Sequence, residues 1–276
     1  MLYSRYAHAA ALCAGKDVLE VACGPGMGLG LLASQARIVV GADYTESLLR
    51  KAHTYYRDTV PLVRLDAHAL PFKDSRFDVI VLFEAIYYLR DPDLFLSDCH
   101  RVLKPGGTLL VCSANKEWSG FNPSPYSTQY FSARELQELL LESQFDCQIL
   151  GAFPGTASTA SQKLVARIRK QAVRLNLIPK TMRGKEALKR LFYGRLVDLG
   201  EAVSEGMAPV EPLVTIPSWE SSSRYKVLYA LAERRPRKAL PSELPGTFSA
   251  LQSGIRVTEE PSEQSSPGRI LNNVRE

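Results

Sequence analysis

Several patterns that define common protein classes are missing from this chain of 276 residues. Its five cysteines show no CxxC spacing and its four histidines no metal-ligand spacing, which argues against a zinc site. No apolar run approaches the roughly 18 residues that a membrane-spanning helix needs. We therefore expect a cytoplasmic protein with reduced, buried thiols and no metal.

A glycine-rich turn after an apolar strand is the most informative feature that is present. Residues 18–28 read V-L-E-V-A-C-G-P-G-M-G, with glycine at every second position from Gly24. Residues without Cβ allow positive φ, and the helix expected from Leu29 would present its N-terminal N–H groups to a ligand. A dinucleotide fingerprint requires glycine where Leu29 stands, and the chain has no Y-x-x-x-K pair. A nicotinamide-dependent reductase is therefore disfavoured.

Three further segments follow in chain order. Residues 37–44 read as an apolar strand that ends in an acid, Asp43, where a carboxylate can accept both hydroxyls of a ribose. Residues 65–72 read L-D-A-H-A-L-P-F and place a second acid after a strand. Residues 77–84 read F-D-V-I-V-L-F-E, and R-V-L-K-P-G-G follows at 101–107.

The combination of E-x-x-x-G-x-G-x-G, D-A-x-x-L-P-F, F-D-V-I and R-V-L-K-P-G-G resembles the type 11 branch of the class I S-adenosylmethionine-dependent methyltransferases. This branch includes the ubiquinone and menaquinone methyltransferases. The resemblance covers about the first 155 residues and a last strand near Tyr225. It implies an enzyme that uses S-adenosyl-L-methionine as cofactor and methylates a small-molecule acceptor.

The expected fold is α/β: a doubly wound, Rossmann-like, seven-stranded and mostly parallel sheet with a helical insertion before the last strand. A helix over 3–12 should lie over the cofactor mouth. Six strands are expected near 17–22, 37–42, 61–65, 77–83, 108–113 and 146–153, and an antiparallel seventh at 226–231.

Domain boundaries follow from composition. We expect a methyltransferase domain over 1–235 that includes a basic helical insertion at 156–217. Residues 236–276 alternate proline, serine, glutamate and glycine with few aromatics, so we expect a disordered tail.

The resemblance implies a cofactor site along the carboxyl ends of the first two strands. The backbone of Gly24 and Gly26 would approach the methionine part, and Glu20 would bind its ammonium directly or through water. Asp43 would accept from the ribose hydroxyls, and Tyr44 beside it belongs to the same site.

Further contacts are implied near the third and fourth strands. Asp66 and the backbone of Ala67 would take the adenine, and Phe83 would offer its carbonyl to the ammonium. In the family a histidine often follows the fourth strand, where this chain has Tyr88. We therefore expect Glu84 and Tyr88 as the catalytic residues. A phenol is a poor general base at neutral pH but can orient an acceptor, and the alternative is an aromatic that only packs.

The segment 163–195 is strongly basic, with eleven Lys and Arg against one Glu in a chain whose formal net charge is +5. Apolar residues recur at helical spacing and predict two amphipathic helices with basic outer faces. We expect them to cover the acceptor pocket and recruit an anionic acceptor, such as a phosphorylated or lipid-linked sugar. The same bases could hold the protein peripherally at an anionic membrane surface, and a solvated basic face is the alternative.

Two other function classes are alternatives to a small-molecule methyltransferase. A nucleic-acid methyltransferase is disfavoured, because the chain lacks an N-P-P-Y-type sequence after the fourth strand, a Pro-Cys nucleophile and an RNA-binding module. A noncatalytic S-adenosylmethionine-binding protein stays open, because Tyr88 departs from the family pattern.

Overall fold

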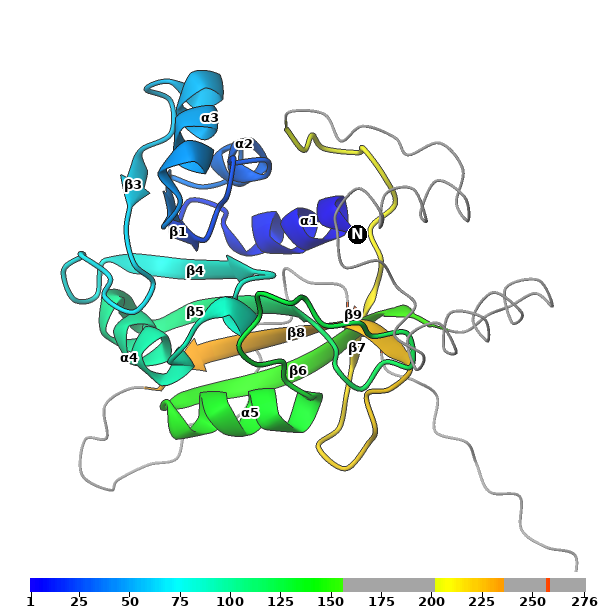
Figure 1. The fold of residues 1–276 in the computed structure, drawn as a ribbon. Helices are drawn as coiled ribbons and strands as arrows, with labels where there is room; N and C mark the ends of the chain where they lie inside the picture. The colour runs from blue at the N-terminus through cyan, green and yellow to red at the C-terminus, as the bar shows by residue number, and fades with distance from the viewer. Residues whose placement is uncertain (156–201, 236–256, 259–276) are drawn as a thin grey trace, which may run out of the picture.

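The computed structural model describes residues 1–155, 202–235 and 257–258. Within these residues one mixed sheet has nine strands in the order β3-β2-β1-β4-β5-β8-β6-β7-β9 (Figure 1). Strands β1 to β6 run in one direction, and β7, β8 and β9 run in the other. The strands are β1 (Asp17–Val21), β2 (Ile38–Asp43), β3 (Leu62–Arg64), β4 (Phe77–Phe83), β5 (Leu103–Ala114), β6 (Phe145–Pro154), β7 (Leu213–Thr215), β8 (Tyr225–Arg234) and β9 (Val257–Thr258).

Two helices of the described part, α4 and α5, begin at side-chain caps. Ser132 and Glu135 form a capping box at the start of α5, and the Asp91 side chain accepts from the Leu94 N–H at the start of α4. The helices are α1 (Leu2–Leu12), α2 (Leu29–Ala33), α3 (Glu46–Tyr56), the 3-10 helix η1 (Ile86–Tyr88), α4 (Pro92–Val102) and α5 (Ala133–Glu142).

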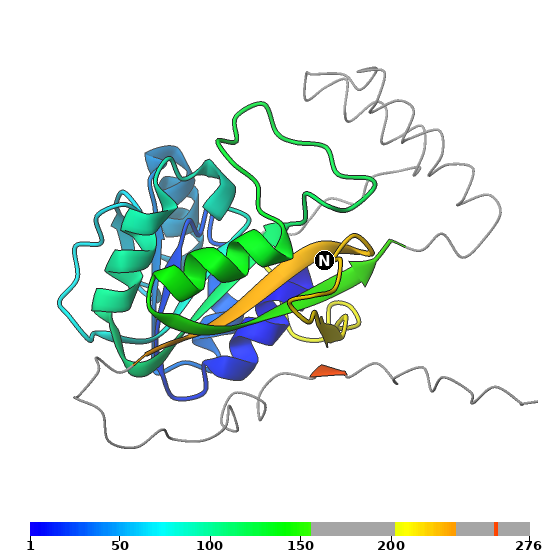
Figure 2. The ribbon, with the colours of Figure 1, turned by 90° about the horizontal axis from the view of Figure 1, so that it is seen from below.

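Helices cover both faces of the sheet, and alternate residues of each central strand point to one face or the other (Figures 1 and 2). Ile80 and Leu82 of β4 pack in the cluster that contains α4 and α5. Val79 and Val81 of the same strand pack in the cluster that contains α1, α2 and α3. The doubly wound architecture therefore follows from apolar strands that are buried on both sides.

The predicted α/β fold is confirmed, with two differences in detail. The last predicted strand is present as β8, antiparallel to β5 and β6. Two short strands were not predicted, however. β7 lies inside the segment 156–217, which was expected to be helical, and it pairs with Leu150 and Gly151 of β6. β9 lies inside the expected disordered tail and pairs with β7.

The basic amphipathic helices predicted at 163–195 and most of the disordered tail predicted at 236–276 cannot be compared with the structure. They fall in 156–201, 236–256 and 259–276, which lie outside the described residues. Among the helices of the described part, none combines the length and hydropathy that crossing a bilayer requires.

Because β1 to β5 are parallel, their carboxyl ends meet at one edge of the sheet. Open α/β sheets bind their ligands at this edge. The loops that follow β1, β2, β3 and β4 carry most of the residues singled out from the sequence.

Candidate active site

The turn after β1 has the backbone conformation that its glycines predict. Gly24 and Gly26 have φ values of +57° and +79°, a region that residues with a side chain rarely occupy. The turn is closed by hydrogen bonds of 3.0 Å from the Gly26 N–H to the Cys23 carbonyl and 2.9 Å from the Cys23 N–H to the Ala42 carbonyl of β2. A Cβ built on Gly24 would meet no atom within 4 Å, so one side of this turn is open.

Glu20 lies on β1, four residues before Gly24, and is 1% exposed. Its Oε1 accepts a 2.6 Å hydrogen bond from the hydroxyl of Tyr6 on α1, whereas Oε2 has no hydrogen-bond partner among the described residues. Burial raises the pKa of Glu20 to about 8, the carboxylate of Asp43 adds to the rise, and the Tyr6 hydrogen bond opposes it. A buried carboxyl group with one oxygen that lacks a hydrogen-bond partner is suited to receive a cationic donor.

Asp43, at the end of β2, connects the first two loops. Its Oδ2 accepts a 2.8 Å hydrogen bond from the Gly24 N–H, and its Oδ1 accepts a 2.7 Å hydrogen bond from the Thr45 N–H. The side chain is buried, but Tyr44 next to it is 68% exposed. The structure therefore joins Gly24 and Asp43 by a hydrogen bond, places Asp43 close enough to act on the charge of Glu20, and leaves Tyr44 exposed.

Asp66 projects from the loop after β3. Its carboxylate is 55% exposed and accepts from the N–H and the ring Nδ1 of His68, at 3.0 and 2.6 Å. These hydrogen bonds lower the pKa of Asp66. Ala67 lies between the two residues in a turn closed by a 3.1 Å bond from the Ala69 N–H to the Asp66 carbonyl. The acid is thus exposed and held in one orientation.

The end of β4 carries Phe83 and Glu84. The Phe83 ring meets the Tyr6 ring edge to face, with 5.2 Å between centroids. Glu84 has a φ of +52°, which is uncommon for a residue with a side chain, and its N–H donates to the Cys112 carbonyl. Its carboxylate forms an ion pair with Arg5 of α1 and accepts a 2.8 Å hydrogen bond from the Tyr87 hydroxyl.

Tyr88, the last residue of η1, is more exposed than its buried neighbour Tyr87. It is 48% exposed, and its ring lies 4.6 Å from that of Tyr87. Tyr87 itself stacks on Tyr130 at 4.4 Å, and burial raises its pKa, with the Glu84 carboxylate adding to the rise. The exposure of Tyr88 agrees with a residue that contacts an acceptor. Its ring contact with Tyr87 agrees equally with the alternative, an aromatic residue that only packs.

Two site residues were missed by the sequence analysis. A helix over the cofactor mouth was expected, but not that Arg5 and Tyr6 of α1 would reach Glu84 and Glu20. The Arg5 side chain is only 14% exposed. The glycine at position 28 makes room for Tyr6, because a Cβ there would lie 1.9 Å from its ring. The third glycine of the motif is therefore needed to leave space for the ring of Tyr6.

No group of three or more His, Cys, Asp or Glu side chains within the described residues is placed to hold a metal ion. The groups that the described residues place at this edge include carboxylates, phenols, the guanidinium of Arg5 and backbone atoms.

A segment in the first half of the chain is similar to a known protein family. A family model described as a methyltransferase domain matches residues 19–111, which run from β1 through most of β5. Residues 19–111, about a third of the chain, are thus similar to the methyltransferase domain of this family. The resemblance drawn from the sequence motifs is therefore confirmed, and the match covers the glycine turn, Asp43, Asp66 and Glu84.

Relatives of the methyltransferase domain carry names that agree with this assignment. A protein of Mycolicibacterium smegmatis named "Probable S-adenosylmethionine-dependent methyltransferase" is 39% identical over 162 residues, which are 56% of this chain and 61% of that protein. A ubiquinone biosynthesis O-methyltransferase of Coxiella burnetii is 31% identical over 110 residues, 39% of this chain and 47% of that protein. The chain thus spans about half to three fifths of the length of these relatives.

The fold of the methyltransferase domain also has a solved counterpart. The YcgJ protein of Bacillus subtilis aligns with 86% of this chain and 99% of its own, with a TM-score of 0.55 and 16% identity. At this identity the likeness shows the fold alone.

Proposed function

We propose that this protein binds S-adenosyl-L-methionine and transfers its methyl group to a small-molecule acceptor. The observation that carries the proposal is the arrangement around Asp43. Asp43, a buried acid at the end of β2, accepts a hydrogen bond from the N–H of Gly24, the first glycine of the turn after β1. The nearby Glu20 has a buried Oε2 that lacks a hydrogen-bond partner among the described residues. The methyltransferase-domain match over 19–111 and the names of the relatives support the same function.

The residues present fit the amino-acid end of this cofactor. The open side of the turn at Gly24 allows a ligand to approach the backbone, whereas a Cβ on Gly26 would lie 2.9 Å from the Tyr56 ring. The free Oε2 of Glu20 and the carbonyl of Phe83 would hold the ammonium, and Asp43 would accept from the ribose hydroxyls.

The exposed Asp66 carboxylate fits the amino group of an adenine, and the backbone of Ala67 would lie along the ring. Tyr44, exposed beside Asp43, would form the rim. These contacts would hold the cofactor, and the loop after β4 would then supply the groups that act on the acceptor.

S-adenosyl-L-methionine supplies a methyl group on a positively charged sulfur. In this proposal the Glu84 carboxylate would lie beside the reacting position, and its Oε atoms would accept the proton of an acceptor hydroxyl or amine. The Arg5 ion pair and the Tyr87 hydrogen bond fix the orientation of this carboxylate. The exposed hydroxyl of Tyr88 would orient the acceptor.

We further propose that the acceptor is anionic, for example phosphorylated or lipid-linked, and that the segment 163–195 recognises it. Support comes from the charge of this segment, eleven bases against one acid, in a chain that is otherwise acidic. An anionic membrane surface would attract the same bases.

Calorimetric titration with S-adenosylhomocysteine, the demethylated product, tests the cofactor assignment. Asp43→Ala should weaken binding by roughly 1 to 3 kcal/mol, because hydrogen bonds to a charged group are lost. Asp58→Ala, which removes an exposed acid, is the matched control and should leave affinity unchanged. Equal affinity of the Asp43 variant, or tighter binding of a nicotinamide cofactor, would contradict the assignment.

A further inference from the structure

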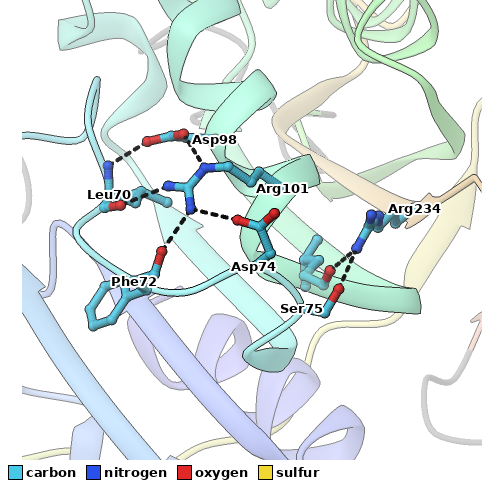
Figure 3. A network of polar contacts seen from close by, with 8 residues as sticks. Leu70, Phe72, Asp74, Ser75, Asp98, Arg101 and Arg234 are labelled. Atoms are coloured by element: carbon cyan, nitrogen blue, oxygen red, sulfur yellow. Dashed lines mark hydrogen bonds and ion pairs between the residues drawn. The ribbon is translucent and has the colours of Figure 1, made fainter. Parts of the chain in front are cut away.

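The R-V-L-K-P-G-G motif contains an arginine whose side chain binds a neighbouring loop. Arg101 stands near the end of α4, and its guanidinium reaches the loop 66–76 between β3 and β4 (Figure 3). Nη2 donates a 2.8 Å hydrogen bond to the carbonyl of Leu70, and Nη1 donates a 2.7 Å hydrogen bond to the carbonyl of Phe72. A planar guanidinium can fix two backbone carbonyls at once, which an ammonium cannot do in the same geometry.

Asp98, one turn earlier on α4, completes this contact. Its Oδ1 accepts a 2.9 Å hydrogen bond from Arg101 Nε, and its Oδ2 accepts from the N–H of Leu70 (Figure 3). Both backbone groups of Leu70 are therefore held by one ion pair of α4. The Leu70 side chain is buried in the core, so the residue is fixed on both sides.

The far end of the loop is also fixed. The N–H groups of Ser75 and Arg76 donate to the carbonyls of Arg101 and Val102, at 3.0 and 2.7 Å. Nη1 of Arg101 reaches Asp74 as well, at 3.1 Å. Residues 70–76 are thus anchored to the end of α4.

The front of the loop carries the exposed acid. Asp66 precedes Leu70 by a single turn, which is closed by the bond from the Ala69 N–H to the Asp66 carbonyl. The hydrogen bonds of the Arg101 guanidinium go to Leu70, Phe72, Asp74 and Asp98, and none goes to Asp66. If Leu70 moved, Asp66 would therefore move with it, because only one turn of backbone joins the two residues.

We propose that Arg101 is a positioning residue that fixes the Asp66 carboxylate for recognition of the adenine amino group. This inference rests on the proposed function and adds a specificity role for the R-V-L-K-P-G-G motif. A carboxylate accepts from the amino group of adenine but faces a carbonyl oxygen when that amino group is replaced by oxygen, as in a hypoxanthine ring. Discrimination between the two rings therefore reports on the placement of Asp66.

The test compares affinities for S-adenosylhomocysteine and S-inosylhomocysteine, its deaminated analogue, by calorimetric titration. Wild type should prefer the adenine compound by about tenfold or more. Arg101→Ala should reduce this ratio to about twofold or less. Arg101→Lys keeps the charge without the planar fork and should also lose most of the ratio. Arg134→Ala, which breaks an exposed pair with Glu138 on α5, is the matched control and should keep it.

A double variant separates positioning from general stability. In an Asp66→Asn background the ratio should already be low, and adding Arg101→Ala should not lower it further. If both Arg101 variants keep the wild-type ratio while their melting temperatures fall, Arg101 is only structural and the inference is overturned, with the proposed function intact. Equal affinity of wild type for both compounds would overturn the role of Asp66 and this inference together. Failure of wild type to bind either compound would overturn the proposed function itself.

Discussion

The hydroxyl of Tyr6 donates a 2.6 Å hydrogen bond to the buried Oε1 of Glu20, so the first helix is attached directly to the acid of the glycine motif. The same ring packs over the glycine at position 28 and against Phe83. α1 is thus part of the candidate cofactor site as well as a cover on one face of the sheet.

The first prediction concerns this hydrogen bond. Tyr6→Phe leaves Oε1 of Glu20 buried without its donor, so the free energy of unfolding should fall by about 1 to 3 kcal/mol. Urea unfolding at constant pH measures the change. Tyr44→Phe removes a hydroxyl from an exposed side chain and should have no measurable effect. Equal stability of the two variants would show that the Tyr6 bond contributes nothing.

The second prediction follows from the pKa of Glu20, which burial raises to about 8. An unfolded glutamate titrates near pH 4.3, so between about pH 4.3 and 8 the folded state keeps a proton that the unfolded chain releases. Its contribution to stability is fully present below this window and is lost as pH rises through 8.

Urea unfolding at pH 6, 7 and 8 measures this loss. Wild type should lose up to about 1.4 kcal/mol per pH unit relative to Glu20→Gln, which cannot ionise. Glu142→Gln alters an exposed glutamate and should follow wild type at every pH. Parallel curves for wild type and Glu20→Gln would contradict the raised pKa.

The third prediction compares two glycines of the same turn. Gly28→Ala places a Cβ 1.9 Å from the Tyr6 ring and should displace it, whereas Gly24→Ala adds a Cβ in open space and costs only the positive φ, about 1 to 2 kcal/mol. In a Tyr6→Ala background, Gly28→Ala should lose most of its extra cost, because the clash is gone. Melting temperatures of the four variants decide this, and an unchanged cost in that background would refute the steric explanation.

Much of the fold could be predicted because its signals are local. The apolar runs of β1, β2 and β4 are buried on both faces, so they stand out without knowledge of their partners. The capping box at Ser132 likewise depends on residues three apart. By contrast, β7 has three residues and pairs with β6 and with the distant β9, and such pairing leaves little trace in the sequence.

The positions of the acids were predictable for the same reason, since each lies at or close to the end of an apolar strand. The contacts of α1 were not. Arg5 and Glu84 are separated by 79 residues, and nothing near either residue indicates the other. The role of Arg101 is similar, because its partners Leu70 and Phe72 contribute only carbonyl groups, which every residue carries.

The fourth prediction concerns the loop after β4. Glu84→Gln and Tyr88→Phe should lower turnover while S-adenosylhomocysteine affinity stays nearly constant, because these side chains face the acceptor in the proposal. Turnover is followed as S-adenosylhomocysteine release with an acceptor found by screening extracts for methylated products. Tyr55→Phe, a second half-exposed tyrosine, is the control for a lost phenol. Full activity of both site variants would mean that positioning alone drives the reaction.

The last prediction tests the basic segment 163–195 as the determinant of acceptor binding. Reversing Arg167, Arg169 and Lys170 to glutamate should raise the acceptor KM and reduce its salt dependence, because attraction between exposed charges is screened over about 8 Å at physiological ionic strength. S-adenosylhomocysteine affinity should not change. Reversing Lys51, Arg57 and Lys73, which are exposed on the described part of the chain, controls for the same change in net charge. If the bases serve a membrane instead, the first variant should stop sedimenting with anionic liposomes, at roughly 1 kcal/mol per lost base. A variant that changes neither acceptor kinetics nor sedimentation would show that the bases are only solvated.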